Sequence, residues 1–91
     1  MQYKCEAMGR QCLVDVEMGR EKIEVKIYGD GPTITILHAY NIALDTSWAI
    51  PNIEQISERA ARAAIADFEG LSKPGLGSYP KMFSGALIPV P

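Results

Sequence analysis

The sequence has few of the residues that form disulfides, bind metals or act as catalytic groups. Its 91 residues include two cysteines, one histidine and one tryptophan. Two cysteines are too few for the disulfide framework of a small secreted protein, and together with one histidine they match no zinc-binding spacing. No motif places a serine or a carboxylate beside His38, so the nucleophile and the orienting acid of a catalytic triad are missing. We therefore expect a protein that is not an enzyme, with no catalytic residue, no metal and no cofactor.

The sequence also lacks the marks of membrane and nucleic-acid proteins. No apolar run reaches the length of a membrane span, and no basic segment followed by an apolar one suggests a signal peptide. The net charge of −2 leaves no excess of basic residues that would displace counterions from a nucleic acid. We expect a cytoplasmic protein in which residues 1–91 form one domain, with a protein as its partner and nucleic acid unlikely.

The sequence does contain a regular alternation of apolar and polar residues over its first 40 positions. Met-Gly-Arg occurs twice, at 8–10 and 18–20, and glycine at the first central position suits a two-residue type II′ hairpin turn. Gly29-Asp30-Gly31-Pro32 provides a third turn, because proline belongs in a loop or at a strand start. The pattern predicts a four-stranded antiparallel β-meander with strands at about 1–8, 11–18, 21–28 and 33–40.

These turns define a register that can be written out from the sequence. They set Cys5 opposite Val14, Val16 opposite Ile23, and Ile23 opposite His38. Cys5 and Cys12 then become diagonal neighbours, which we expect to be buried thiols. The charged residues Lys4, Asp15, Glu17, Lys22, Glu24 and Lys26 fall on a solvated outer face, with Glu17 opposite Lys22. One set of residues shares the other face: Tyr3, Cys5, Ala7, Cys12, Val14, Val16, Ile23, Val25, Ile27, Ile34 and Ile36.

An apolar sheet face needs a cover, and residues 52–69 supply one. Asn52 is a favourable N-cap, and Gly70 is a natural stop for a helix. Apolar residues recur between them at helical spacing: Ile53, Ile56, Ala60, Ala64 and Phe68. The sequence therefore predicts an α+β fold in which one helix covers one face of the meander.

The connector and the tail are apolar for segments without regular structure. The tail, residues 72–91, carries four prolines, yet it ends in a run of apolar residues. A disordered tail is usually polar. We therefore expect this tail to dock, either on its own fold, for example as an added edge strand, or on another subunit. The residues expected to bind a partner are Trp48, Tyr79, Met82, Phe83 and Leu87.

Two functions are compatible with these observations. The first is a non-enzymatic protein–protein interaction module, whose edge strands at 1–8 and 33–40 invite strand addition by a partner or a homodimer. In size and acidity the chain resembles mobile-element or phage-encoded inhibitors, such as anti-CRISPR proteins, that bind a larger host complex. The second is a single-stranded nucleic-acid-binding domain, because four strands followed by one helix are similar in outline to the whirly family of single-strand binders.

Overall fold

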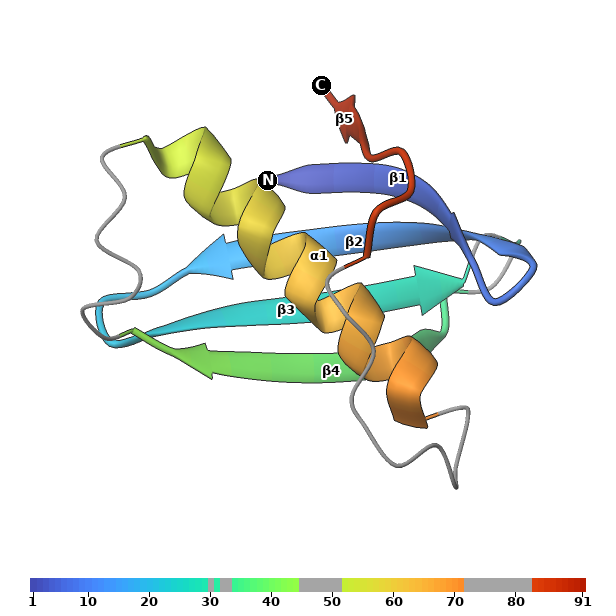
Figure 1. Cartoon of the computed structure of the whole chain (residues 1–91), viewed down its shortest axis with the longest axis horizontal. Coiled ribbons are helices and arrows are strands. Elements are labelled where there is room, and N and C mark those ends of the chain that lie inside the picture. The colour runs from blue at the N-terminus through green and yellow to red at the C-terminus, as the bar shows by residue number, and fades with distance from the viewer. Residues whose placement is uncertain (30, 32–33, 45–51, 72–82) are drawn as a thin grey trace.

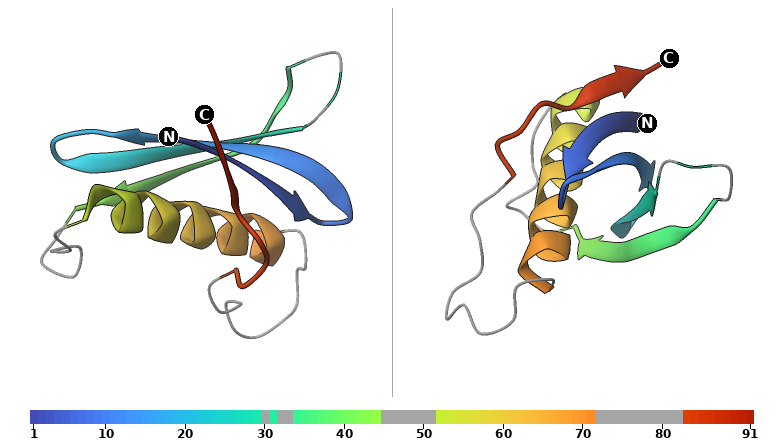
Figure 2. Two further views of the ribbon diagram at one scale, coloured as in Figure 1. Left: turned by 90° about the horizontal axis from the view of Figure 1, so that it is seen from above. Right: turned by 90° about the vertical axis from the view of Figure 1, so that its right-hand side faces the viewer.

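The computed structural model describes residues 1–29, 31, 34–44, 52–71 and 83–91. Four antiparallel strands are followed by a helix that lies across one face of their sheet (Figures 1 and 2). The predicted α+β fold is therefore confirmed. The described strands run in the spatial order β4-β3-β2-β1-β5. The elements are β1 (Gln2–Ala7), β2 (Arg10–Met18), β3 (Lys22–Gly29), β4 (Ile36–Ala43), α1 (Ile53–Leu71) and β5 (Ile88–Val90).

The first hairpin turn lies one residue earlier than predicted. Ala7 pairs with Arg10, so the turn residues are Met8 and Gly9, with φ of 56° and 74°. Two positive φ values are the combination of a type I′ turn, so the predicted type II′ turn is wrong. Moving a turn by one residue moves the strand register by two and leaves every side chain on its predicted face. Cys5 accordingly lies opposite Cys12.

The second hairpin turn lies one residue later than predicted. The Gly19 N–H donates to the Lys22 carbonyl at 2.9 Å, which makes Arg20 and Glu21 the turn residues. Val16 consequently lies opposite Val25, where Ile23 was predicted. The register is again displaced by two residues, and the buried face is again preserved.

The last strand of the meander is displaced further, and two predicted core residues are wrong. The Gly29 N–H donates to the Thr35 carbonyl at 3.1 Å, so the loop is longer than the predicted four residues and β4 starts later. Ile34 and Ile36 are therefore 83% and 55% exposed. Ile42 takes the position opposite Ile23 that had been assigned to His38.

The core lies between the sheet and α1. All of the other sheet residues predicted for the core are buried, and Ile42 joins them. Most of the predicted helical stripe is confirmed, because Ala60 and Ala64 are buried and Ile56 and Phe68 pack against the core. Ile53 is the exception at 59% exposed, and the fully buried Ile65 was not predicted. Alanines dominate this stripe, which allows the helix backbone to approach the sheet closely. The helical residues of the core are Ala60, Ala61, Ala64 and Ile65, with Phe68 partly buried beside them.

The helix begins as predicted and ends later. The side-chain oxygen of Asn52 accepts hydrogen bonds from the N–H groups of Glu54 at 2.8 Å and Gln55 at 3.4 Å, as an N-cap does. The helix then continues through Gly70 to Leu71, so Gly70 is not the residue that stops it.

The described end of the tail adds a strand to the sheet. Residues of β5 pair antiparallel with β1, Ile88 with Lys4 and Val90 with Gln2. Pro89 lies opposite Tyr3 in this edge strand, where a missing N–H is tolerated. The expectation that the first strand is an edge is therefore wrong over this stretch: among the described strands, the outermost are β5 and β4.

Candidate functional site

Among the described residues, no strand pairs with the backbone groups along the outer side of β4. The Leu44 N–H donates to the Glu21 carbonyl of the β3 hairpin at 2.9 Å. In an antiparallel ladder, residues that bond to the neighbouring strand alternate with residues whose backbone groups point away from it. Because Leu44 bonds inward, the N–H and C=O groups of Ala39, Asn41 and Ala43 point to the open side of the strand.

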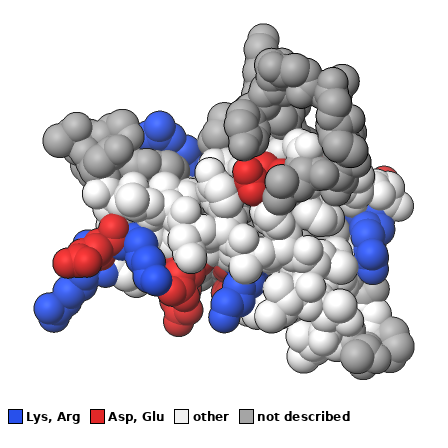
Figure 3. Space-filling model, turned by 90° about the horizontal axis from the view of Figure 1, so that it is seen from below, with Lys and Arg blue, Asp and Glu red and all other residues white. Residues whose placement is uncertain are grey.

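In the part of the chain that the structure describes, the open side of β4 lacks the usual protection of an edge strand. No other described strand pairs with it, and its sequence from Ile36 to Ala43 contains no charged residue and no proline. Natural edge strands are commonly protected by lysine, proline, short length or a bulge. A register shift opposite Ile27 and Tyr28 distorts the start of β4 only. Figure 3, which views the molecule from the β4 side, shows a broad area without charged side chains.

The outer face of the sheet carries a second apolar feature. The strand pairings align one residue from each strand in a single row: Ile88, Lys4, Leu13, Tyr28 and Ile36. Ile36 and Ile88 at the two ends of this row are 55% and 61% exposed. Leu13 and Tyr28 were not predicted as part of a functional surface, although both lie at outward positions of their strands, where polar residues are expected from the alternation.

Charged residues gather at the opposite end of the outer face. Asp15 lies opposite Lys26, whereas Glu17 lies opposite Glu24. Lys22 contacts Glu24 on its own strand, with nitrogen and oxygen 3.2 Å apart. The predicted cross-strand pair of Glu17 with Lys22 is therefore wrong, because the second turn is displaced. Mixed charges of this kind are typical of a solvated surface.

The single histidine pairs with a carboxylate of the helix. His38 Nε2 lies 2.8 Å from Asp67 Oδ2, and the two side chains are 13% and 20% exposed. The His38 ring also lies 5.5 Å from the Phe68 ring, measured between centroids. Within the described residues, the structure records no serine or cysteine bonded to His38 and no group of three residues able to hold a metal. The pair joins the start of β4 to the C-terminal half of α1.

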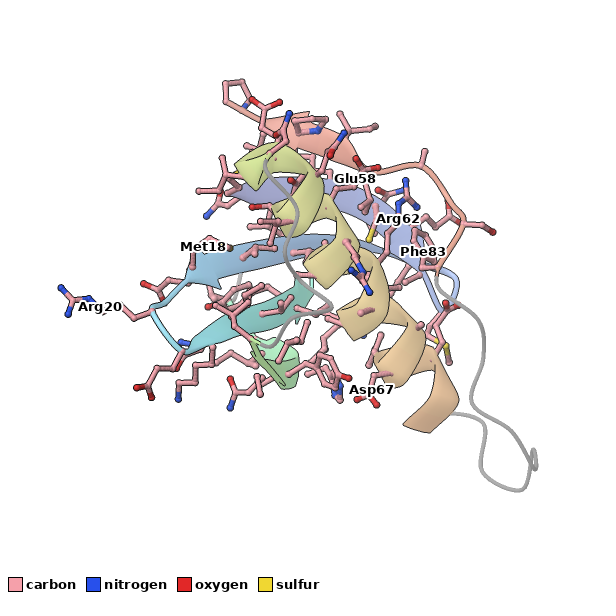
Figure 4. All side chains as sticks on the ribbon, turned by 60° about the vertical axis from the view of Figure 1, so that its left-hand side comes forward. Met18, Arg20, Glu58, Arg62, Asp67 and Phe83 are labelled. Atoms are coloured by element: carbon pink, nitrogen blue, oxygen red, sulfur yellow. The ribbon has the colours of Figure 1, made fainter. Side chains whose placement is uncertain are left out.

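Arg62 holds the tail against the helix. Its Nη1 donates to the carbonyls of Phe83 at 2.9 Å and Gly85 at 2.7 Å. The guanidinium also binds Glu58 at 3.0 Å, the i,i+4 pair that the helical spacing predicts, and lies 5.9 Å from the Phe83 ring centroid. Figure 4 shows Glu58, Arg62 and Phe83 together on one side of α1. The link to the tail carbonyls has no signal in the sequence, because backbone acceptors carry no residue identity.

The two thiols lie face to face in the core. Cys5 and Cys12 are opposite one another, not diagonal as predicted, and both are free and buried. Burial, with a contribution from the neighbouring Cys12, raises the pKa of the Cys5 thiol to about 11. Burial also raises the pKa of Cys12. Thiols held in the protonated form are poor nucleophiles at neutral pH, so these residues are suited to filling the core.

The residues expected to bind a partner are divided between described and undescribed segments. Phe83 and Leu87 are partly buried and pack against this chain's own core. Trp48, Tyr79 and Met82 lie outside the described residues. The open side of β4 is therefore the candidate interaction surface of the described chain.

Comparisons with known proteins identify no relative. No family model, no curated protein and no solved structure matches the chain. Among the described residues, no helix combines the length and apolar character needed to cross a membrane.

Proposed function

We propose that this protein is a non-enzymatic interaction module that binds another protein through the open side of β4. The observation that supports this proposal is the row of outward backbone groups at Ala39, Asn41 and Ala43 on an uncharged strand. In strand addition, the main chain of an extended partner segment supplies the missing hydrogen bonds, and alternate side chains give specificity.

The surroundings of β4 favour a partner strand with apolar residues. Ile34 and Ile36 are exposed beside the start of the strand. Tyr28 lies opposite Ile36 on the outer face and extends the apolar surface inward from the edge. A partner segment with apolar residues at alternate positions would contact these side chains while its backbone bonds to β4.

We further propose that the partner is a component of a larger host complex. This step is supported by the length of 91 residues and the net charge of −2, which are features of small inhibitors encoded by phages and mobile elements, anti-CRISPR proteins among them. An inhibitor of this kind acts by covering a functional surface and needs no catalytic group of its own.

The alternative is a single-stranded nucleic-acid-binding domain, which the order of four strands and one helix favours. Phosphate contacts require basic residues gathered along one surface. On the outer face of the described sheet, Lys22 and Lys26 are interspersed with Asp15, Glu17 and Glu24. This mixed charge favours the protein-binding proposal.

Partner capture with β4 variants tests the proposal. Asn41→Pro removes an outward N–H without removing a bond to β3, so we expect capture of the partner to fall about ten-fold or more. Asn41→Ala alters only the side chain and serves as the matched control, with capture retained. Circular dichroism checks that both variants remain folded.

Equal capture by the wild type and by folded Asn41→Pro would overturn the proposal. Salt-dependent binding to a labelled oligonucleotide would support the alternative.

A further inference from the structure

We propose that a second copy of this chain can occupy the open side of β4. Two chains join their β4 strands antiparallel around a two-fold axis, with Asn41 of each opposite Asn41 of the other. The inference rests on the open edge invoked in the proposed function, and it names one occupant of that edge. It continues the sheet of one copy directly into the sheet of the other.

The hydrogen-bond pattern of β4 selects this register. A two-fold axis perpendicular to the sheet relates the strands antiparallel, and the residues that face across must be those whose N–H and C=O groups point outward. Centring the axis on Asn41 sets Ala39 opposite Ala43, so all three outward residues gain partners. This register uses the regular half of β4 and avoids the shift opposite Ile27 and Tyr28.

Charge also favours pairing of β4 with itself. The residue on a two-fold axis faces its own copy, so a charged residue at position 41 would face a like charge at roughly 5 Å. The residues from Ile36 to Ala43 carry no charge, and the outward residues Ala39, Asn41 and Ala43 are small. The other outer strand, β5, has three residues and includes Pro89, which obstructs continuous pairing there.

The helix leaves the required half of β4 accessible. Asp67 and Phe68, in the C-terminal half of α1, contact His38 near the start of the strand. Figure 1 shows that α1 crosses the sheet obliquely, from β1 at its N-terminal end to the start of β4. On the face that α1 covers, the proposed register sets Tyr40 opposite Ile42 of the partner subunit, an aromatic–aliphatic pair that extends the apolar layer.

Sedimentation velocity on the full chain tests the self-pairing. We expect the wild type to form a dimer whose fraction rises with concentration. Asn41→Lys places two ammonium groups at the axis, so we expect the dissociation constant of the dimer to rise about ten-fold or more. Gln11→Lys, at an exposed outer-face position of β2, is the matched control and retains the dimer. Circular dichroism spectra that match the wild type show that both variants are folded.

Cross-linking tests the register. Asn41→Cys brings two thiols together across the axis, at a Cα separation that a disulfide can span. An azo oxidant such as diamide takes up the two thiol protons and two electrons and is reduced to a hydrazine as the S–S bond forms. We expect rapid formation of a covalent dimer with Asn41→Cys and much slower formation with Ala39→Cys, because residue 39 does not face its own copy.

Each outcome separates this inference from the proposed function. A wild type that stays monomeric at all concentrations, or a dimer that survives Asn41→Lys, overturns the self-pairing. If the chain is monomeric but Asn41→Pro still abolishes capture of another protein, the proposed function stands alone. If Asn41→Lys removes the dimer while Asn41→Pro captures the other protein normally, the self-pairing stands and the proposed binding surface is wrong.

Discussion

Individual residues in the core show how burial controls ionisation. Cys5 is 4% exposed and faces another thiol, so its thiolate would lose hydration without gaining a positive partner. Tyr3 lies in the same core, and burial together with Glu58 and Glu54 raises the pKa of its phenol. These residues contribute to the core in their neutral forms.

The pKa of Cys5 predicts a loss of stability in alkali. The pKa of Cys5 is about 11 in the folded state against an ordinary value of 9.0, so the folded state binds the thiol proton more tightly than the unfolded state. The stabilisation is complete below about pH 9 and is lost as the pH rises toward 11. We expect the melting temperature of the wild type to fall over this range.

The variant Cys5→Ala isolates this contribution. It lacks the titrating thiol, so its melting temperature should fall less steeply between pH 9 and 11 than that of the wild type. Tyr3 and Cys12 also titrate in alkali and are common to both proteins, which makes the difference in slope the informative quantity. Identical slopes in scanning calorimetry would show that the Cys5 thiol is not shifted in this way.

At the scale of elements, the alternation of apolar and polar residues predicted which sheet face each side chain occupies better than it predicted which residue lies opposite on the next strand. Both early turns were displaced by one residue, which moved Cys5 and Val16 to different partners and left each of them buried. Side chains alternate with a period of two, so errors of this size preserve the face. The length of the loop before β4 is not set by this alternation. The loop is longer than predicted, so Ile34 and Ile36 lie outside the core.

The candidate surface was predictable only in part. The sequence indicated edge strands, but it placed one of them at residues 1–8, where β5 covers Gln2, Tyr3 and Lys4. The outward direction of Asn41 follows from the hydrogen bond of Leu44 to Glu21, which depends on a register that the apolar pattern does not specify. Composition alone did show that β4 is uncharged.

The contact between α1 and the tail leads to a prediction about Arg62. Arg62→Lys keeps the positive charge but removes the planar fork that donates to the Phe83 and Gly85 carbonyls. We expect the variant to lose about 1–3 kcal/mol of stability and to lose amide-exchange protection at Ile88 and Val90, the two residues of β5 that carry an N–H. Arg20→Lys is the control, because Arg20 is exposed and points away from the fold (Figure 4). Unchanged protection of β5 in Arg62→Lys would contradict the proposed anchoring.

At the scale of the whole molecule, the two outer strands of the sheet differ in kind. On one side, β5 covers β1 and is held there by residues that pack on the core, including Phe83 and Leu87. On the other side, β4 is longer and uncharged, and no described strand pairs with its outer side. Within the described part of the chain, one side of the sheet is therefore closed by β5 and the other is left open.

Removal of residues 83–91 tests this asymmetry. The deletion takes away β5, uncovers the outer side of β1, and removes Phe83 and Leu87 from the core surface. We expect a lower melting temperature and a new tendency to associate, because an exposed edge strand pairs readily with other chains.

Combining the deletion with Asn41→Lys separates the two edges, since association through β1 should persist when β4 pairing is blocked. Sedimentation and calorimetry measure both effects. A truncated protein that melts like the full chain and stays monomeric with Asn41→Lys would show that β5 neither stabilises nor protects β1.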